Sequence, residues 1–169
     1  MASITPFLWF DHQAEQAAKF YVSVFPQGKI LRVARYPEGG PGPAGSVMTV
    51  KFRVRGQEFV ALNGGPVYKI TPAVSFVVEC RTQREVDNYW KRLSAGGKKV
   101  QCGWLEDKFG VSWQIVPTAL LELTEGGDTA RTQRVFAAML KMVKLDLRKL
   151  RAAARPPGPV RFREPAKKP

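Results

Sequence analysis

Residues 72–98 read PAVSFVVECRTQREVDNYWKRLSAGGK, and this stretch predicts a strand followed directly by a helix. The first part, residues 72–80, is apolar and rich in β-branched side chains, which is typical of a buried strand. Thr82-Gln83-Arg84-Glu85 is a capping box, in which the threonine hydroxyl and the glutamate carboxylate satisfy free amides at a helix start. We therefore expect a helix over about 83–95, ended by Gly96-Gly97.

The same order occurs earlier, where residues 4–29 read ITPFLWFDHQAEQAAKFYVSVFPQGK. Here we expect a strand over 4–10, Asp11 as the N-cap, and a helix over about 12–25 with one apolar face. That face consists of Ala14, Ala18, Tyr21 and Phe25. Further strands are predicted at 29–36, 46–54 and 57–63 after the first helix, and at 98–101, 102–106 and 111–116 after the second.

Two successive strand–helix–strands modules predict a single α+β domain, because each half-covered sheet must bury its open face. After Pro117 the sequence predicts a short helical turn at 118–123. A helix over about 130–145 follows, capped by Asp128 or Thr129, and then a helical stretch at 146–154. The apolar stripe of the longer helix comprises Val135, Met139, Met142 and Leu145. It can pack on its own sheet or on a partner.

Composition indicates a globular chain with a basic end. The chain has 169 residues, 44% of them hydrophobic, and a net charge of +13. Residues 148–169 hold eight Lys or Arg against one acid, Glu164. Residues 155–169 contain five prolines, which predicts a disordered or polyproline-like basic tail. The tail is either a solvated terminus or a weak binder of an acidic surface such as nucleic acid or lipid.

The sequence shows no apolar run of membrane-spanning length and no secretory signal near its start, so we expect a cytoplasmic protein without membrane contacts. Cys80 and Cys102 form no Cys-x-x-Cys motif. Two small, partly buried thiols are the expected state in a reducing compartment, with a disulfide or a reactive thiol as the alternatives.

Several separate strings resemble one known family. They are Thr5-Pro6-Phe7-Leu8-Trp9-Phe10-Asp11, Lys19-Phe20-Tyr21-Val22-Ser23-Val24-Phe25-Pro26, Ala61-Leu62-Asn63-Gly64-Gly65-Pro66 and Asp107-Lys108-Phe109-Gly110-Val111-Ser112-Trp113-Gln114-Ile115-Val116-Pro117. Over about residues 3–150 the chain is similar to the PhnB-like family of the vicinal oxygen chelate (glyoxalase–bleomycin resistance) superfamily. Many members of that family are labelled 3-demethylubiquinone-9 3-methyltransferase.

The resemblance implies a fold and an assembly. Two βαβββ modules, at 3–66 and 70–117, would form a curved, barrel-like mixed sheet with a concave cleft, as in glyoxalase and dihydroxybiphenyl dioxygenase. C-terminal helices at 118–154 would complete a domain over residues 1–150, with the tail at 155–169 outside it. The resemblance also implies a homodimer, and superfamily enzymes hold a divalent metal in the cleft.

This chain does not keep the residues for that metal. Its single histidine, His12, lies at a predicted helix start, where we expect it to be solvated. The family's ligand positions fall near Pro6, Ala73 and Gln114, and of these only Gln114 could coordinate an ion. We predict no cofactor, with a divalent metal as the less favoured alternative. A Gly-rich loop for a methyl donor is also missing after the first strand, so the methyltransferase label does not follow from the residues.

Strand alternation selects six residues that would line the cleft, and Trp104 is expected near its mouth. The seven are Leu8, Phe10, Asn63, Ser75, Trp104, Ser112 and Gln114. No catalytic nucleophile–base pair is recognisable. Acid–base chemistry would require Glu58, Glu79, Glu106 or Asp107, and the last two are expected in a solvated turn.

The sequence favours a PhnB-like protein that binds an unknown small molecule in the cleft, without a catalytic metal and with no recognised reaction. One alternative is an enzyme acting on a small oxygenated substrate, of the glyoxalase, dioxygenase or methyltransferase kind. Another is binding of nucleic acid or an acidic partner through the basic tail.

Overall fold

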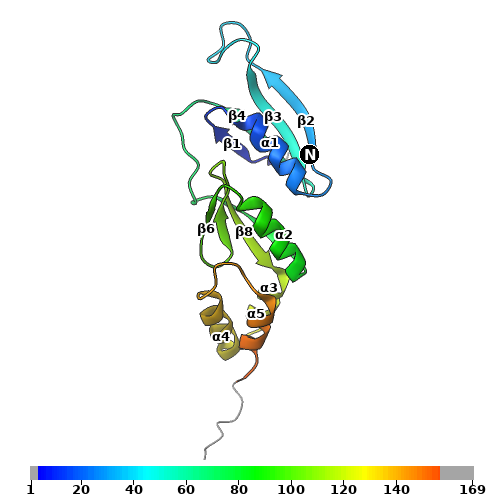
Figure 1. The fold of residues 1–169 in the computed structure, drawn as a ribbon, viewed down its shortest axis with the longest axis vertical. Coiled ribbons are helices and arrows are strands. Elements are labelled where there is room, and N and C mark those ends of the chain that lie inside the picture. Colours follow the sequence, from blue (N-terminus) through cyan, green and yellow to red (C-terminus); the bar gives the residue numbers. More distant parts are fainter. Residues whose placement is uncertain (1–3, 157–169) are drawn as a thin grey trace, which may run out of the picture.

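The computed structural model describes residues 4–156, and its first half is a four-stranded sheet with one helix on one face (Figure 1). The elements are β1 (Phe7–Phe10), α1 (Ala14–Val24), β2 (Lys29–Arg35), β3 (Val47–Val54) and β4 (Gln57–Asn63). The strand order is β1-β4-β3-β2, with β1 parallel to β4 and the other pairs antiparallel.

The second half repeats this arrangement in the same order. Its elements are β5 (Ser75–Cys80), α2 (Gln83–Leu93), β6 (Lys98–Lys99), β7 (Trp104–Glu106) and β8 (Ser112–Pro117). The strand order β5-β8-β7-β6 matches that of the first sheet, again with one parallel pair, β5 and β8. The predicted fold class, α+β with two βαβββ modules, is confirmed. The two sheets are open and do not close into a barrel.

Helix α1 begins later than the sequence predicts, and its cap comes from a distant strand. The N-cap position is Gln13, which makes no side-chain cap bond, so the prediction of Asp11 as the cap was wrong. Instead the Ala14 amide donates to the Oδ1 atom of Asn63 at the end of β4, over 2.7 Å. The predicted apolar face of Ala14, Ala18, Tyr21 and Phe25 is fully buried.

Helix α2 begins as the sequence predicts. The Glu85 amide donates to the hydroxyl of Thr82, and the Glu85 carboxylate accepts from the Thr82 amide. This reciprocal capping box confirms the prediction, because both partners lie within one turn of chain.

The modules join through their helix-covered sides, where one apolar core runs from the first sheet to the second. The rings of Phe25 and Tyr89 stack with centroids 5.2 Å apart, and Phe25 also packs on Trp113 at 5.5 Å. The guanidinium of Arg92 on α2 donates to the Val24 carbonyl at the end of α1, over 2.9 Å. The open faces of the two sheets are therefore left outside this core.

Three helices follow β8 and pack on their own chain: α3 (Thr118–Thr124), α4 (Thr129–Met139) and α5 (Leu147–Ala154) (Figure 1). The longer helix predicted to residue 145 ends at Met139, although Asp128 caps it as expected. Val135, Met142, Leu145 and Leu150 form a second, smaller core. Part of the predicted tail, residues 157–169, lies outside the described residues. In the described part, none of the helices has the length and apolarity that crossing a bilayer requires.

Candidate functional site

The seven residues that the sequence selected fall on two different faces. In the first module, strand register pairs Leu8 with Ala61 and Phe10 with Asn63, so these side chains lie on the face that α1 covers. Leu8 and Phe10 are buried in the core. The Asn63 side chain is held by structural bonds, accepting from Ala14 and donating to the Val47 carbonyl over 2.9 Å. The open face of this sheet carries Phe7 and Trp9 instead.

The other four share the open face of the second sheet. Register pairs Ser75 with Ser112 and Trp104 with Gln114, which places all four side chains on the side away from α2. The Gln114 amide donates to the Ser75 hydroxyl over 2.9 Å. Ser112 is buried, whereas Ser75, Trp104 and Gln114 are half-buried. The structure therefore brings four of the seven candidates together.

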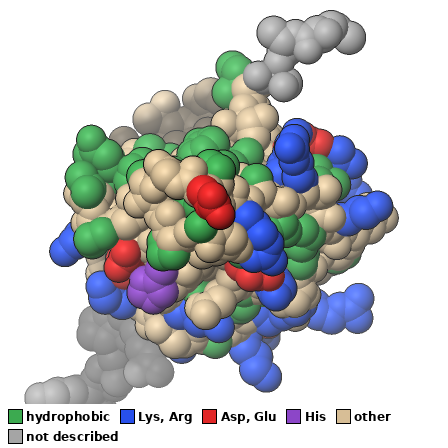
Figure 2. Space-filling view, turned by 90° about the horizontal axis from the view of Figure 1, so that it is seen from above, with side chains coloured by type: hydrophobic (Ala, Val, Ile, Leu, Met, Phe, Trp, Pro, Cys, Tyr) green, Lys and Arg blue, Asp and Glu red, His purple; other side chains and the backbone are tan. Residues whose placement is uncertain are grey.

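These residues do not fit the metal of the superfamily enzymes. Hydroxyl and amide side chains are weak donors for a divalent transition metal, which prefers imidazole and carboxylate. Within residues 4–156, no three His, Cys, Asp or Glu side chains gather in one place. His12 lies on the surface beside Asp11, in the first module and not on the open face of the second sheet. It is the purple side chain in Figure 2.

Asp107 is buried, which corrects the expectation of a solvated turn. Its side chain is 2% exposed and accepts four hydrogen bonds. Oδ2 accepts from the Tyr21 hydroxyl and the Trp113 indole, each over 2.8 Å. Oδ1 accepts from the amides of Phe109 and Val111. Burial raises the pKa of the Asp107 carboxyl, and these four donors partly offset that effect. Because every oxygen is engaged within the core, we assign Asp107 a structural role.

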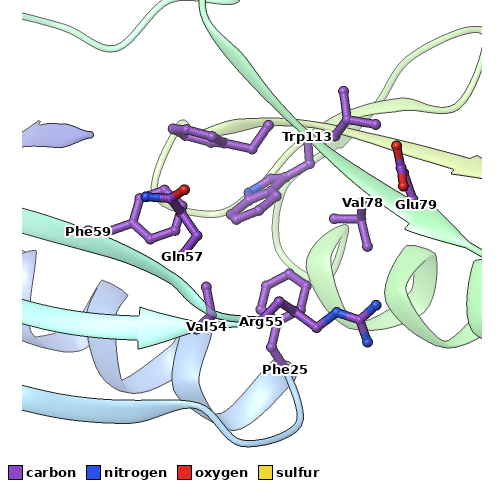
Figure 3. A pocket seen from close by; sticks show the side chains of 10 residues that line it. Phe25, Val54, Arg55, Gln57, Phe59, Val78, Glu79 and Trp113 are labelled. Carbon is purple, nitrogen blue, oxygen red and sulfur yellow. The ribbon is translucent and has the colours of Figure 1, made fainter. Parts of the chain in front are cut away.

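A cavity of about 390 Å³ lies where the two modules meet (Figure 3). Its apolar wall comes from both modules and consists of Phe25, Val54, Phe59, Phe76, Val77, Val78 and Trp113. Three polar side chains complete the lining: Arg55, Gln57 and Glu79. An apolar enclosure with a few polar groups is the usual form of a small-molecule site.

Arg55 is the positively charged side chain of the cavity lining. It lies in the β3–β4 turn with a φ of 51°, followed by Gly56 with a φ of 84°. The side chain is exposed, and within residues 4–156 its guanidinium forms no hydrogen bond or salt bridge. Figure 3 shows it extending from the first module toward the side where Val78 and Glu79 of β5 lie.

This cavity could not be predicted from the sequence. Residues 55 and 56 lie between two predicted strands and were assigned no role in a binding site, and Glu79 was considered only as an acid–base residue. The cavity depends on how the tip of the first sheet meets the edge of the second, and no local pattern encodes that contact.

A larger pocket of about 730 Å³ lies in the first module. It is bordered by the loop between β2 and β3 and by the start of α1, where His12 and Glu15 contribute to its rim. Tyr36 also lines this pocket, and its hydroxyl donates a hydrogen bond to the Asn63 carbonyl over 2.5 Å. Of the seven residues predicted to line the cleft, only Asn63 lines this pocket. Its side chain already accepts a hydrogen bond from the Ala14 amide at the start of α1.

Comparison with known proteins places the chain in a family. The sequence profile described as 3-demethylubiquinone-9 3-methyltransferase matches residues 2–116. A structure described as a putative 3-demethylubiquinone-9 3-methyltransferase, PhnB protein, from Bacillus cereus is 37% identical. The alignment covers 69% of this chain and 100% of the Bacillus protein, with a TM-score of 0.63. No curated protein matches the chain.

Two more distant structures show the same fold. Protein PA1353 from Pseudomonas aeruginosa is 22% identical over 69% of this chain and 98% of its own, with a TM-score of 0.57. The fosfomycin resistance protein FosX from Listeria monocytogenes is 13% identical over 74% and 98%, with a TM-score of 0.54. On the evidence of the profile and the Bacillus structure, the chain belongs to the PhnB-like 3-demethylubiquinone-9 3-methyltransferase family.

Proposed function

We propose that this family member binds a small aromatic molecule with an anionic group in the junction cavity, without a catalytic metal. The observation that carries the proposal is Arg55, whose guanidinium forms no hydrogen bond or salt bridge within residues 4–156, at an apolar cavity about 390 Å³ in volume. This volume lies within the range of about 300–1,000 Å³ that is usual for small-molecule sites.

The apolar wall is suited to an aromatic ring because its own rings are already fixed. Phe59 and Phe76 meet edge to face at 5.1 Å, across the boundary between the modules. Phe76 in turn lies 5.5 Å from Trp113. Such contacts hold the ring faces in place before a ligand arrives, so little side-chain entropy is lost on binding.

The charged groups indicate how the ligand would be oriented. A guanidinium forms two parallel hydrogen bonds with a carboxylate, which gives both affinity and direction. Glu79 is exposed on the opposite module and forms no salt bridge with Arg55. A ligand amine could therefore reach Glu79, and the two charges allow acidic and amino analogues to be compared.

Calorimetry with three probes tests this proposal: indole-3-acetate, indole and tryptamine. We expect indole-3-acetate to bind most tightly to the native protein. Arg55→Gln should weaken its binding at least about tenfold, since a hydrogen-bonded charge contributes about 1.5–3 kcal/mol. Arg55→Lys should restore part of the loss. Arg32→Gln, which removes an exposed charge on β2, is the matched control.

Two results would overturn the proposal. One is the absence of binding by indole-3-acetate at millimolar concentration. The other is equal binding by the native protein and Arg55→Gln, which would show that the guanidinium does not contact the acid. Preference for tryptamine would instead assign the charged contact to Glu79, against the anionic ligand class proposed here.

The exposed open faces support a second proposal, that a homodimer forms over them. Phe7 on β1 is 60% exposed and Val77 on β5 is 54% exposed, each on an edge strand of its sheet. Exposed apolar side chains that form a contiguous patch mark interaction surfaces. A second copy would then cover Ser75, Trp104 and Gln114 and enclose the cleft that the sequence predicts.

Light scattering tests the dimer. The native chain should have the mass of a dimer, and Phe7→Glu should shift it toward the monomer. Val67→Glu, at a loop residue that is also exposed, is the control. A monomeric native protein at high micromolar concentration would refute this second proposal and leave the junction cavity unaffected.

A further inference from the structure

We propose that the exposed face of helix α5 binds the phosphate backbone of duplex DNA, independently of sequence. This surface is separate from the junction cavity and does not rest on small-molecule binding.

The excess positive charge of the chain is concentrated at its C-terminal end. Residues 129–169 hold twelve Lys or Arg against two acids, Asp146 and Glu164, a net charge of +10 out of +13 for the whole chain. Residues 1–128 are therefore close to neutral for their length. Such segregation creates a local positive potential, which attracts polyanions and accelerates their association.

Helix α5 presents its part of this charge on one side. Leu147 is buried in the main core and Leu150 in the second core, whereas residues 148, 149, 151 and 152 are exposed. The exposed set is Arg148, Lys149, Arg151, Ala152 and, at the C-cap, Arg155. At 3.6 residues per turn, Arg148, Arg151 and Ala152 lie on the same side of the helix, and Ala152 leaves room for a close approach.

These cations have no acidic partner within residues 4–156. Lys144, just before the helix, forms a salt bridge with Asp87. None of the four basic residues of the α5 face forms such a bridge in that range. Their charge is thus available to an external anion.

The helix is held in place from both ends, so the cationic face is fixed before binding. Asp146 caps it by accepting from the amides of Arg148 and Lys149 over 2.8 and 3.1 Å. At the other end, the Arg134 guanidinium donates to the carbonyls of Ala153 and Ala154. The Gln83 side chain on α2 ties the preceding segment to the second module through Leu145 and Leu147.

The chemistry of the face favours nucleic acid over a lipid surface. Membrane-bound amphipathic helices insert large apolar side chains beside their cations. The exposed side of α5 carries none, because its leucines are buried. Three of its four cations are arginines, which bind phosphate in a bidentate manner, and duplex DNA carries about one phosphate charge per 1.7 Å of its axis.

Fluorescence anisotropy of the full-length chain with a labelled 20-base-pair duplex tests the proposal between 50 and 200 mM KCl. The affinity should fall with salt, and the slope of log K against log salt should be about −0.9 per phosphate contact. The triple variant Arg148→Gln, Arg151→Gln, Arg155→Gln should reduce this slope by about 2.7. Changing the same residues to Lys should preserve it.

The control removes three exposed charges elsewhere: Arg32→Gln, Arg84→Gln, Lys91→Gln. It lowers the net charge equally and should leave the slope nearly unchanged. An unchanged slope in the α5 variant would overturn the proposal. Loss of binding in Arg161→Gln, Arg163→Gln with no effect of the α5 variant would assign the contact to the chain end instead. Tighter, α5-dependent binding to phosphatidylglycerol vesicles than to DNA would also reject it.

Discussion

The hydroxyl of Tyr21 on α1 donates a hydrogen bond of 2.8 Å to the Oδ2 atom of Asp107, which precedes β8 in the other module. Both side chains are buried, at 1% and 2% exposure. The bond therefore connects the two modules through the interior. Burial, together with the Asp107 charge, raises the pKa of Tyr21 well above its usual range, so its hydroxyl remains a donor.

Replacing Tyr21 by Phe should destabilise the protein by about 1–3 kcal/mol, because it removes a hydrogen bond to a buried acid without changing the ring. Urea unfolding measures the change. Tyr89→Phe is the control, since within residues 4–156 the Tyr89 hydroxyl has no hydrogen-bond partner and its ring is similarly buried. Equal effects of the two substitutions would contradict a specific role for the Tyr21 bond.

Asp107 should make stability depend on pH in an unusual direction. Burial raises the pKa of its carboxyl in the folded protein, so the folded state binds a proton more readily than the unfolded state. Its contribution to stability is then greatest at acid pH and falls as pH rises from the ordinary value of 3.8 through the raised pKa.

The variant Asp107→Asn provides the reference for this effect. The free energy of unfolding of the native protein minus that of the variant should decrease with pH over that window and level off above it. Glu15, Glu58, Glu85 and Asp87 have lowered pKa values and opposite pH dependence, but both proteins share them. A difference that increases with pH would show that the hydrogen bonds outweigh burial.

Asn63→Ala should cost about 1–2 kcal/mol, because it removes the acceptor for the Ala14 amide at the start of α1. Asp11→Ala should change stability by less than about 0.5 kcal/mol, since Asp11 does not cap the helix. Thermal unfolding of both variants measures the contrast. A larger loss of stability in Asp11→Ala than in Asn63→Ala would show that Asp11 caps the helix, as the sequence predicts.

Cys80 should resist alkylation in the native protein. The thiol is buried, and burial raises its pKa to about 12, which leaves little thiolate at pH 8. Cys102 is half-buried, so iodoacetamide should modify it first. Mass spectrometry before and after addition of urea checks the order, and rapid native labelling of Cys80 would show that the β5–α2 junction opens readily.

The sequence determined the features that depend on neighbouring residues. The capping box of α2, the buried face of α1 and the alternation along β8 all arise from spacings of two to four residues. The repeated order of strand and helix was likewise readable, and the family strings agree with it. These features survive in the structure because their physical causes are local.

Tertiary structure alone decided where distant groups meet. Asn63 caps a helix 49 positions away, and Asp107 became buried because Tyr21 and Trp113 supply donors from separate elements. The junction cavity arises in the same way, since Arg55 and Glu79 face one space only after the modules pack. Burial and hydrogen-bond partners at such sites are set by the packing of whole modules, which the order of residues along the chain does not display.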